Sequence, residues 1–158
     1  MDEIKIRKAS LGDMEELLAF EQDLIKIERP FDPTIKADPV NYYDLKGMLT
    51  APHVEVVIAE VNSKIIASGY ARIDRSKPFL KHENHAYLGF MYVLPEFRGQ
   101  GLNKKIIDTL KKWAVTQGIN EFRLEVYYDN VSAIKAYEKI GFSRYSLEMR
   151  YNLEDKKK

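Results

Sequence analysis

The chain has 158 residues, 45% of them hydrophobic and 31% charged, with a formal net charge of +1 and no cysteine. This length suits one compact domain, so a single domain over residues 1–158 is expected. The balanced charge gives no reason to expect a nucleic-acid or membrane partner, and the lack of cysteine excludes disulfides, a cysteine nucleophile and thiolate metal ligands.

The two ends of the chain carry no targeting pattern. The start lacks the basic-then-apolar order of a secretory signal, and no stretch reaches the roughly 18 apolar residues of a membrane span. We therefore expect a cytoplasmic protein. The terminal run Lys156–Lys158 is expected to be a solvated tail.

The first fifty residues predict a strand, two helices and a loop. Ile4 and Ile6 alternate as a short strand, and apolar residues then recur at helical spacing from Met14 to Ile25. Ser10 is placed as the cap of this helix, with Asp13 completing an approximate capping box. Three prolines make residues 28–40 a loop, which leads into a short helix at residues 41–49.

The middle of the chain predicts three strands. Residues 54–61 and 64–73 are rich in β-forming residues and are separated by Asn62-Ser63, which is a hairpin signal. A third strand is expected at residues 85–93, and Pro95 ends it.

The rest of the chain alternates helices and strands. Helices are expected at residues 103–117 and 132–140, the first ended by Gly118 and the second capped by Asn130. Between them, alternation from Phe122 to Tyr128 predicts a strand, and residues 142–153 are expected to add one or two more. The order predicts an α/β fold: a mixed, mostly antiparallel central sheet that contains a parallel pair, with helices on both faces.

The segment at residues 93–103 joins a strand to an amphipathic helix through two glycines. Gly99 and Gly101 let the backbone approach a ligand, and the first amides of the helix have no internal partner, so an anion such as phosphate is favoured. Arg98 adds a permanent positive charge. A glycine-rich connection with a surface arginine explains these residues equally well.

Two other phosphate motifs do not match this segment. A dinucleotide fingerprint needs a glycine where the chain has Lys104, and a P-loop needs Gly-Lys-Ser/Thr. The segment instead resembles the acetyl-coenzyme A motif of the GNAT family of N-acetyltransferases. Arg98 and Gly101 match it, as does the preceding run from Pro95 to Gly99, whereas Asn103 replaces the usual glycine or alanine.

A second block, about thirty residues further on, resembles the family's other characteristic motif. It consists of a strand and an asparagine-capped helix that ends in Gly-Phe, and reads Leu124-Glu125-Val126, Asn130, Ala133-Ile134, Tyr137-Glu138-Lys139 and Gly141-Phe142.

The resemblance implies a binding site for acetyl-coenzyme A between two splayed parallel strands, which end near Val93 and Tyr128. The pantetheine arm would pair with the backbone of the first strand, at Met91, Tyr92 and Val93. The phosphates would lie on the loop residues Arg98, Gly99, Gln100, Gly101, Leu102 and Asn103, with a further coenzyme contact from Asn130.

Gly89 lies in the middle of the first of these strands. A mid-strand glycine marks either a bulge that starts the splay or room for a neighbouring aromatic side chain, and the sequence leaves both open. Many family members carry a glutamate here, so that source of a general base is closed.

The resemblance also implies direct attack of an amine on the thioester. Tyr137 would donate a proton to the departing thiolate, and Glu125 would serve as general base. Tyr137 could instead be a core aromatic and Glu125 a surface carboxylate, and Glu83 and His85 are the other candidate bases. The histidines and nearby acids show no metal-ligand spacing.

The acceptor is expected to be a small-molecule amine, with a peptide amine as the alternative. The region after the first helix offers acidic and aromatic residues that suit a cation, although a solvated acidic face is the commoner explanation: Glu21, Asp23, Glu28, Arg29, Phe31, Asp32, Asp38, Tyr42 and Tyr43. A non-catalytic acyl-coenzyme A binding module and a nucleotide-binding protein are the competing classes. The sequence does not fix the oligomeric state and leaves a homodimer open.

Overall fold

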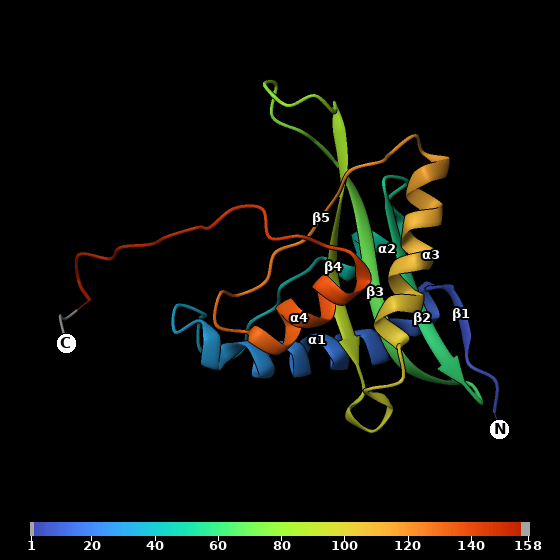
Figure 1. Ribbon diagram of the computed structural model, residues 1–158. Coiled ribbons are helices and arrows are strands. Elements are labelled where there is room, and N and C mark those ends of the chain that lie inside the picture. Colours follow the sequence, from blue (N-terminus) through green and yellow to red (C-terminus); the bar gives the residue numbers. More distant parts are fainter. Residues whose placement is uncertain (1, 156–158) are drawn as a thin grey trace. The chain divides into compact units, whose positions relative to one another are not determined.

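The computed structural model describes residues 2–155 (Figure 1). Its contacts divide the chain into two compact units, Met1–Glu125 and Val126–Lys158. The single domain over residues 1–158 therefore stays a prediction. The expected tail at residues 156–158 lies outside the described residues.

A five-stranded sheet forms the centre of the first unit, in the spatial order β1-β2-β3-β4-β5. Its first three pairings are antiparallel and only β4 and β5 run parallel, which confirms the predicted mixed sheet. The strands are β1 (Lys5–Lys8), β2 (Val54–Val61), β3 (Lys64–Arg75), β4 (Asn84–Val93) and β5 (Phe122–Arg123).

The hairpin between β2 and β3 turns at the predicted dipeptide. Asn62 and Ser63 both have positive φ, 49° and 65°. Two consecutive positive φ values belong to the type I′ turn, whose twist matches that of the flanking strands.

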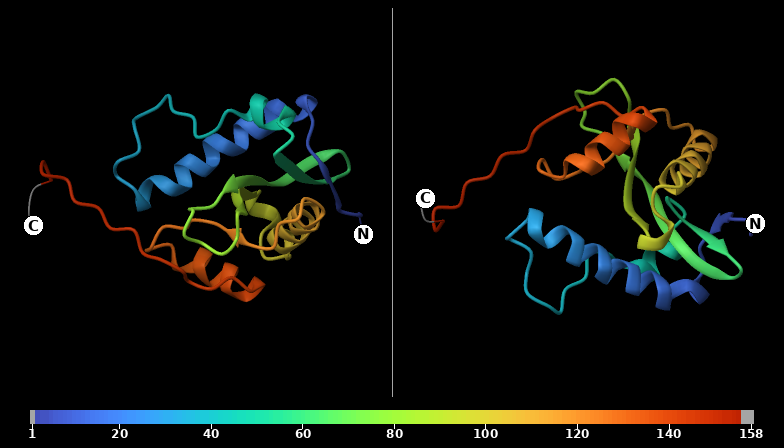
Figure 2. Two further views of the ribbon diagram at one scale, coloured as in Figure 1. Left: turned by 90° about the horizontal axis from the view of Figure 1, so that it is seen from above. Right: turned by 60° about the horizontal axis from the view of Figure 1, so that its bottom comes forward.

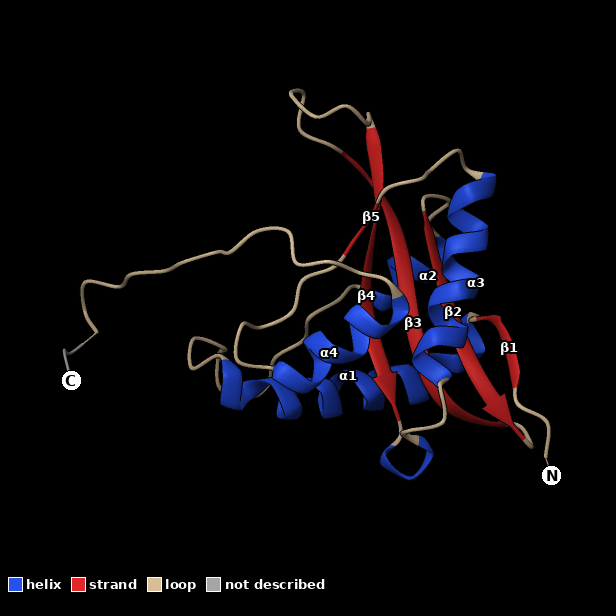
Figure 3. Ribbon diagram, in the orientation of Figure 1, coloured by secondary structure: helices blue, strands red, loops and turns tan. Residues whose placement is uncertain are grey.

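Helices cover both faces of this sheet, as predicted (Figures 2 and 3). On one face, α1 (Met14–Glu28) and α2 (Leu45–Thr50) bury Leu17, Leu24 and Leu45 against β2 and β4. On the other face lies α3 (Leu102–Thr116), whose buried stripe contains Ile106, Ile107 and Leu110. Of the helices within residues 2–155, none is both long and apolar enough to cross a membrane.

Three predicted elements differ from the structure. The short helix starts at Leu45 instead of residue 41, because the Asp44 carboxylate accepts the Gly47 amide at 3.1 Å and caps it there. The strand predicted to run to Tyr128 is only β5, because Phe122 and Arg123 alone pair with β4. No strand is assigned in the described residues 142–155, so the predicted closing strands are wrong for this structure.

The second unit contains one helix, α4 (Val131–Ile140), within residues 126–155. The Asn130 side chain accepts the Ala133 amide at 3.3 Å, which confirms the predicted N-cap. Gly141, with φ 121°, ends the helix, and the Phe142 amide donates to the Tyr137 carbonyl at 3.0 Å. The local signals at both ends of α4 were therefore read correctly.

Candidate active site

β4 is interrupted by a bulge. Its register against β3 shifts between the pairs Ser68–Tyr92 and Tyr70–Gly89, and Phe90 has a φ of 55°. The fully buried Ser68 hydroxyl donates to the Phe90 carbonyl at 3.0 Å, so the bulge leaves that carbonyl satisfied. The bulge that Gly89 suggested is present one residue further on.

Gly89 also makes room for an aromatic side chain. A Cβ atom at this position would lie 2.7 Å from both the Cζ and the hydroxyl oxygen of Tyr70. Both interpretations of this glycine therefore hold, since Tyr70 occupies the space beside the bulge.

The outer edge of β4 opens at the bulge. β5 pairs only with Ala86 and Tyr87, so within residues 2–125 no strand covers that edge from Leu88 onward. The Leu94 amide donates to the Ile66 carbonyl on the β3 side at 2.9 Å. By strand alternation, the backbone groups of Met91 and Val93 face the open edge and those of Tyr92 face β3.

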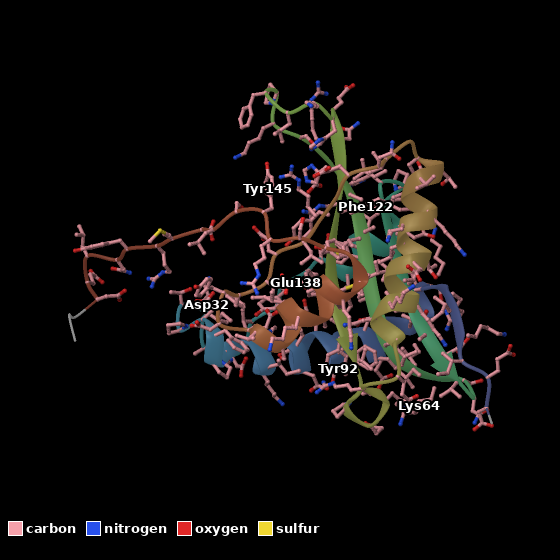
Figure 4. All side chains as sticks on the ribbon, in the orientation of Figure 1. Asp32, Lys64, Tyr92, Phe122, Glu138 and Tyr145 are labelled. Carbon is pink, nitrogen blue, oxygen red and sulfur yellow. The ribbon has the colours of Figure 1, made fainter. Side chains whose placement is uncertain are left out.

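The side chain of Tyr92 links β4 to α1, and its predicted coenzyme contact stays a prediction. Its hydroxyl donates to the Asp23 carboxylate of α1 at 2.9 Å, and its ring packs on Phe20 with centroids 4.7 Å apart. Figure 4 labels Tyr92 near the carboxyl end of β4. These contacts fix the carboxyl end of β4 against α1.

The glycine loop after β4 has the geometry of an anion site. Gly99 and Gly101 have φ values of 78° and 77°, and a Cβ at either would meet nothing within 4 Å. Their backbone conformation, rather than space, therefore requires glycine. α3 begins directly after Gly101, and the first amides of a helix have no intrahelical acceptor.

Arg98 is held at the mouth of this loop. Its Nε donates to the Val93 carbonyl at 2.8 Å, and its guanidinium lies 5.7 Å from the Tyr92 ring centroid. These contacts fix the positive charge of Arg98 beside the end of β4. Asn103 places a buried side-chain oxygen in the first turn of α3 with no hydrogen-bond partner among the described residues.

A cluster of three tyrosines, Tyr43, Tyr70 and Tyr87, lies next to the bulge. The ring centroids of Tyr43 and Tyr70 are 5.7 Å apart, and those of Tyr70 and Tyr87 are 6.4 Å apart. Tyr43 also packs on Phe90, with a centroid distance of 5.1 Å. The tyrosine cluster therefore meets β4 where its edge opens.

Arg72 covers one side of the tyrosine cluster. Its guanidinium lies 5.1 Å from the Tyr87 centroid and 5.9 Å from that of Tyr70. Asp74 holds it by two hydrogen bonds of 2.7 and 2.9 Å. The charge of Arg72 is thus already compensated within the site.

Two carboxylates border the tyrosine cluster. Burial raises the pKa of Glu28, which lies at the end of α1. The pKa of Tyr43 is raised as well, first by burial and then by the neighbouring Tyr70 and Glu28. Glu125 is exposed and accepts the Tyr87 hydroxyl at 3.0 Å. Burial, followed by the charge of Glu125, holds the pKa of Tyr87 above its usual range.

The other candidate acids and bases are already engaged. Glu21 is fully buried and accepts hydrogen bonds from the Asn41 side chain and the amides of Tyr42 and Tyr43 at 2.7 to 2.9 Å. It therefore anchors the loop at residues 41–43 and is not part of a solvated face. His85 Nδ1 lies 2.8 Å from the Ser76 hydroxyl, and burial lowers its pKa. Glu83 pairs with Arg75 at 4.0 Å.

Tyr137 and Asn130 belong to the second unit. The Tyr137 ring packs edge-on against Phe142, with centroids 5.9 Å apart, so the Gly-Phe ending of α4 fixes the direction of the tyrosine. The roles of both residues stay predictions.

Sequence reasoning missed Tyr70 and Tyr87. The available signal was Gly89, because a glycine in a strand makes room for a large side chain on the neighbouring strand. Which residue fills that room depends on the register between β3 and β4, and the bulge shifts this register.

The sequence profile of the Acetyltransferase (GNAT) family matches residues 21–142. The chain belongs to the GNAT acetyltransferase family. The predicted fold and the prediction of an acetyl-coenzyme A-dependent N-acetyltransferase are thereby confirmed.

Relatives of this GNAT acetyltransferase include proteins with named acceptors. Thialysine N-epsilon-acetyltransferase of Bos taurus is 29% identical over 144 residues, which cover 87% of this chain and 83% of the relative. The aminoglycoside N-acetyltransferase AAC(6')-Iy, solved with coenzyme A, superposes with a TM-score of 0.77 at 20% identity, covering 98% and 97% of the two chains.

A third similar protein is a predicted acetyltransferase of Clostridium acetobutylicum solved with acetyl-CoA. It has a TM-score of 0.77 at 24% identity, over 96% of this chain and 97% of that one. At these identities the solved structures show the common fold. No group of three or more potential metal ligands converges within residues 2–155.

Proposed function

We propose that this GNAT acetyltransferase transfers the acetyl group of acetyl-coenzyme A to a primary amine of a small, cationic molecule. The observation that carries the proposal is the tyrosine cluster beside the β4 bulge, bordered by Glu28 and Glu125. Aromatic faces and carboxylates together suit an ammonium group. The names of the bovine relative and of the aminoglycoside enzyme, both acting on small-molecule amines, support it.

The residues of the first unit fit acetyl-coenzyme A. Met91 and the amide of Val93, whose carbonyl already accepts from Arg98, would pair with its pantetheine arm at the open edge of β4. The glycine loop with Arg98 would hold its phosphates. The bound co-substrate supplies a thioester carbonyl that an amine attacks directly, without a covalent enzyme intermediate. Asn130 of the second unit would add a coenzyme contact.

The acceptor amine must lose a proton before it reacts. For an amine with a pKa of about 10.4, deprotonation at pH 7 costs roughly 4 to 5 kcal/mol. Glu28 would bind the ammonium form of the substrate, and Glu125, oriented by the Tyr87 hydroxyl, would accept the proton. Tyr137 would donate its proton to the thiolate that leaves.

The test is release of free coenzyme A thiol across a panel of amines: polyamines, free amino acids, aminoglycosides and peptides with free N-termini. We expect turnover on a small cationic amine. Tyr137→Phe should slow kcat by about a hundredfold, the lower end of general acid–base effects. Tyr151→Phe, an exposed tyrosine of the same unit, is the matched control and should leave kcat unchanged.

Other outcomes would favour the competing functions. Turnover on peptides alone would assign a protein acceptor. Binding of acetyl-coenzyme A with no turnover on any amine would assign a non-catalytic binding module.

A further inference from the structure

A glycine of the central strand β3 lies opposite the bulge of β4. The register between the two strands skips Gly69, so this residue alone faces the two bulge residues Phe90 and Met91. Unlike Gly99 and Gly101, Gly69 does not have a positive φ, so its backbone conformation does not require glycine.

The space around Gly69 requires glycine instead. A Cβ atom there would lie 2.6 Å from the Cγ2 methyl carbon of Ile106 on α3 and 2.7 Å from the sulfur of Met91 on β4. Non-bonded carbon atoms have their optimal separation at about 3.5–4.0 Å, so neither neighbour leaves room for a side chain. Ile106 is fully buried. The space beside Gly69 is therefore filled by one group from α3 and one from β4.

These two groups come from the two parts of the proposed coenzyme site. Ile106 lies near the start of α3, which directly follows the glycine loop, and Met91 lies on the open edge of β4. β3 itself is held inside the sheet, where Gly69 pairs with Val57 of β2. Because β3 cannot move aside, any atoms added at position 69 must displace α3 or Met91.

We infer that Gly69 is a positioning residue for acetyl-coenzyme A. Its lack of a side chain sets the spacing between the start of α3, where the phosphates would bind, and the open edge of β4, where the pantetheine arm would pair. This inference rests on the placement of acetyl-coenzyme A proposed above. A ligand that spans both parts needs them at their native spacing, so a small displacement of either one weakens its binding.

Gly69→Ala tests this role by isothermal titration calorimetry. The free variant relieves the contact by moving α3 or Met91, and binding must restore the strained spacing. The Kd of acetyl-coenzyme A should therefore rise about tenfold or more. Gly47→Ala is the control, because a Cβ there would meet only the exposed Asp44 carboxylate at the cap of α2. It should lower the unfolding midpoint and leave the Kd unchanged.

Ile106 offers a specific rescue. On a helix, the two Cβ branches of an isoleucine or a valine fill both allowed side-chain directions, whereas a leucine fills one of them. Gly69→Ala/Ile106→Leu should therefore bind acetyl-coenzyme A to within about threefold of wild type, since the flexible end of Met91 can move. Gly69→Ala/Ile106→Val is the matched control and should stay weakened, because valine keeps the branch that meets position 69.

A second measurement covers the loss of stability. One added methyl group costs less than the usual stability of a domain, so Gly69→Ala should remain folded. The rise of the unfolding midpoint with acetyl-coenzyme A reports affinity even in a partly unfolded sample.

Three results would overturn the inference. Gly69→Ala could bind acetyl-coenzyme A within about twofold of wild type, the error expected for independent sites. The two double variants could recover affinity equally. Gly47→Ala could lose as much affinity as Gly69→Ala, which would show that affinity follows stability alone.

Gly101→Ala separates this inference from the proposed function, because Gly101 lies in the glycine loop itself. Weaker binding in Gly101→Ala with unchanged binding in Gly69→Ala would leave the proposed coenzyme site in place and overturn only the spacing role. Unchanged binding in both variants would place the phosphates elsewhere and overturn both proposals.

Discussion

Glu28 combines a proposed role in amine binding with a stability cost. Burial raises its pKa above 4.5, the value for an unperturbed glutamate. A raised folded-state pKa means that the protonated form stabilises the fold. That contribution is fully present below pH 4.5 and is lost as the pH rises through the raised value. At pH 7 the ionised carboxylate therefore works against folding.

Glu28→Gln should consequently raise the thermal unfolding midpoint at pH 7 while it weakens acetylation. The gain should shrink as the pH falls and vanish below about pH 4.5, where wild type is protonated as well. KM for the amine should rise about tenfold or more, as expected for a lost charged hydrogen bond. Calorimetry at several pH values and steady-state kinetics measure the two effects. A lower midpoint at pH 7 would contradict the assignment.

Single residues were predictable where the signal is local. Asn130 caps α4 and Asp13 accepts the Ser10 amide at 2.8 Å, since both contacts span three residues. Glu21 was misread because its partners, the Asn41 side chain and two backbone amides, lie about twenty residues away, and sequence patterns do not mark such contacts. Tyr70 was missed for the same reason.

At the scale of elements, the glycine loop and the start of α3 together form the proposed phosphate site. Gly101 and Gly118 flank α3, both with positive φ and both with open space where a Cβ would be. Replacing either with alanine should cost about 1–2 kcal/mol of stability through left-handed backbone strain alone. The two positions therefore differ in their surroundings: Gly101 lies at the start of α3, beside the proposed phosphate site, and Gly118 follows the end of the helix.

Gly101→Ala should also weaken acetyl-coenzyme A binding, because strain at the helix start moves the amides proposed to hold phosphate. Gly118→Ala is the matched control and should bind acetyl-coenzyme A as wild type does. Isothermal titration calorimetry with both variants decides this. Equal affinities would place the phosphates elsewhere.

The elements themselves were predictable to different degrees. The hairpin around Asn62 and Ser63 and the helices α1, α3 and α4 follow from local periodicity and caps. The length of β5 was overestimated. Alternation shows which residues suit a strand, but it does not show how many of them pair with the neighbouring strand, here β4. The alternating segment at residues 142–153 has the pattern of a strand and no assigned ladder.

For the whole molecule, the two units should differ in resistance to proteolysis. The first unit contains the buried residues of the described chain, and residues 126–155 contain none. The protein should be cut first by chymotrypsin between Tyr145 and Leu153, where large apolar side chains are exposed. Mass spectrometry of the fragments over time measures this; equal rates of cleavage throughout the chain would contradict it.

The contact between Tyr70 and Gly89 also constrains how this enzyme can change over evolutionary time. A Cβ at position 89 would lie 2.7 Å from the tyrosine ring, so any larger residue there requires the ring of Tyr70 to move. A lineage that gains a carboxylate at position 89 gains it more easily where residue 70 is smaller. Substitutions at these two positions on neighbouring strands should therefore depend on each other.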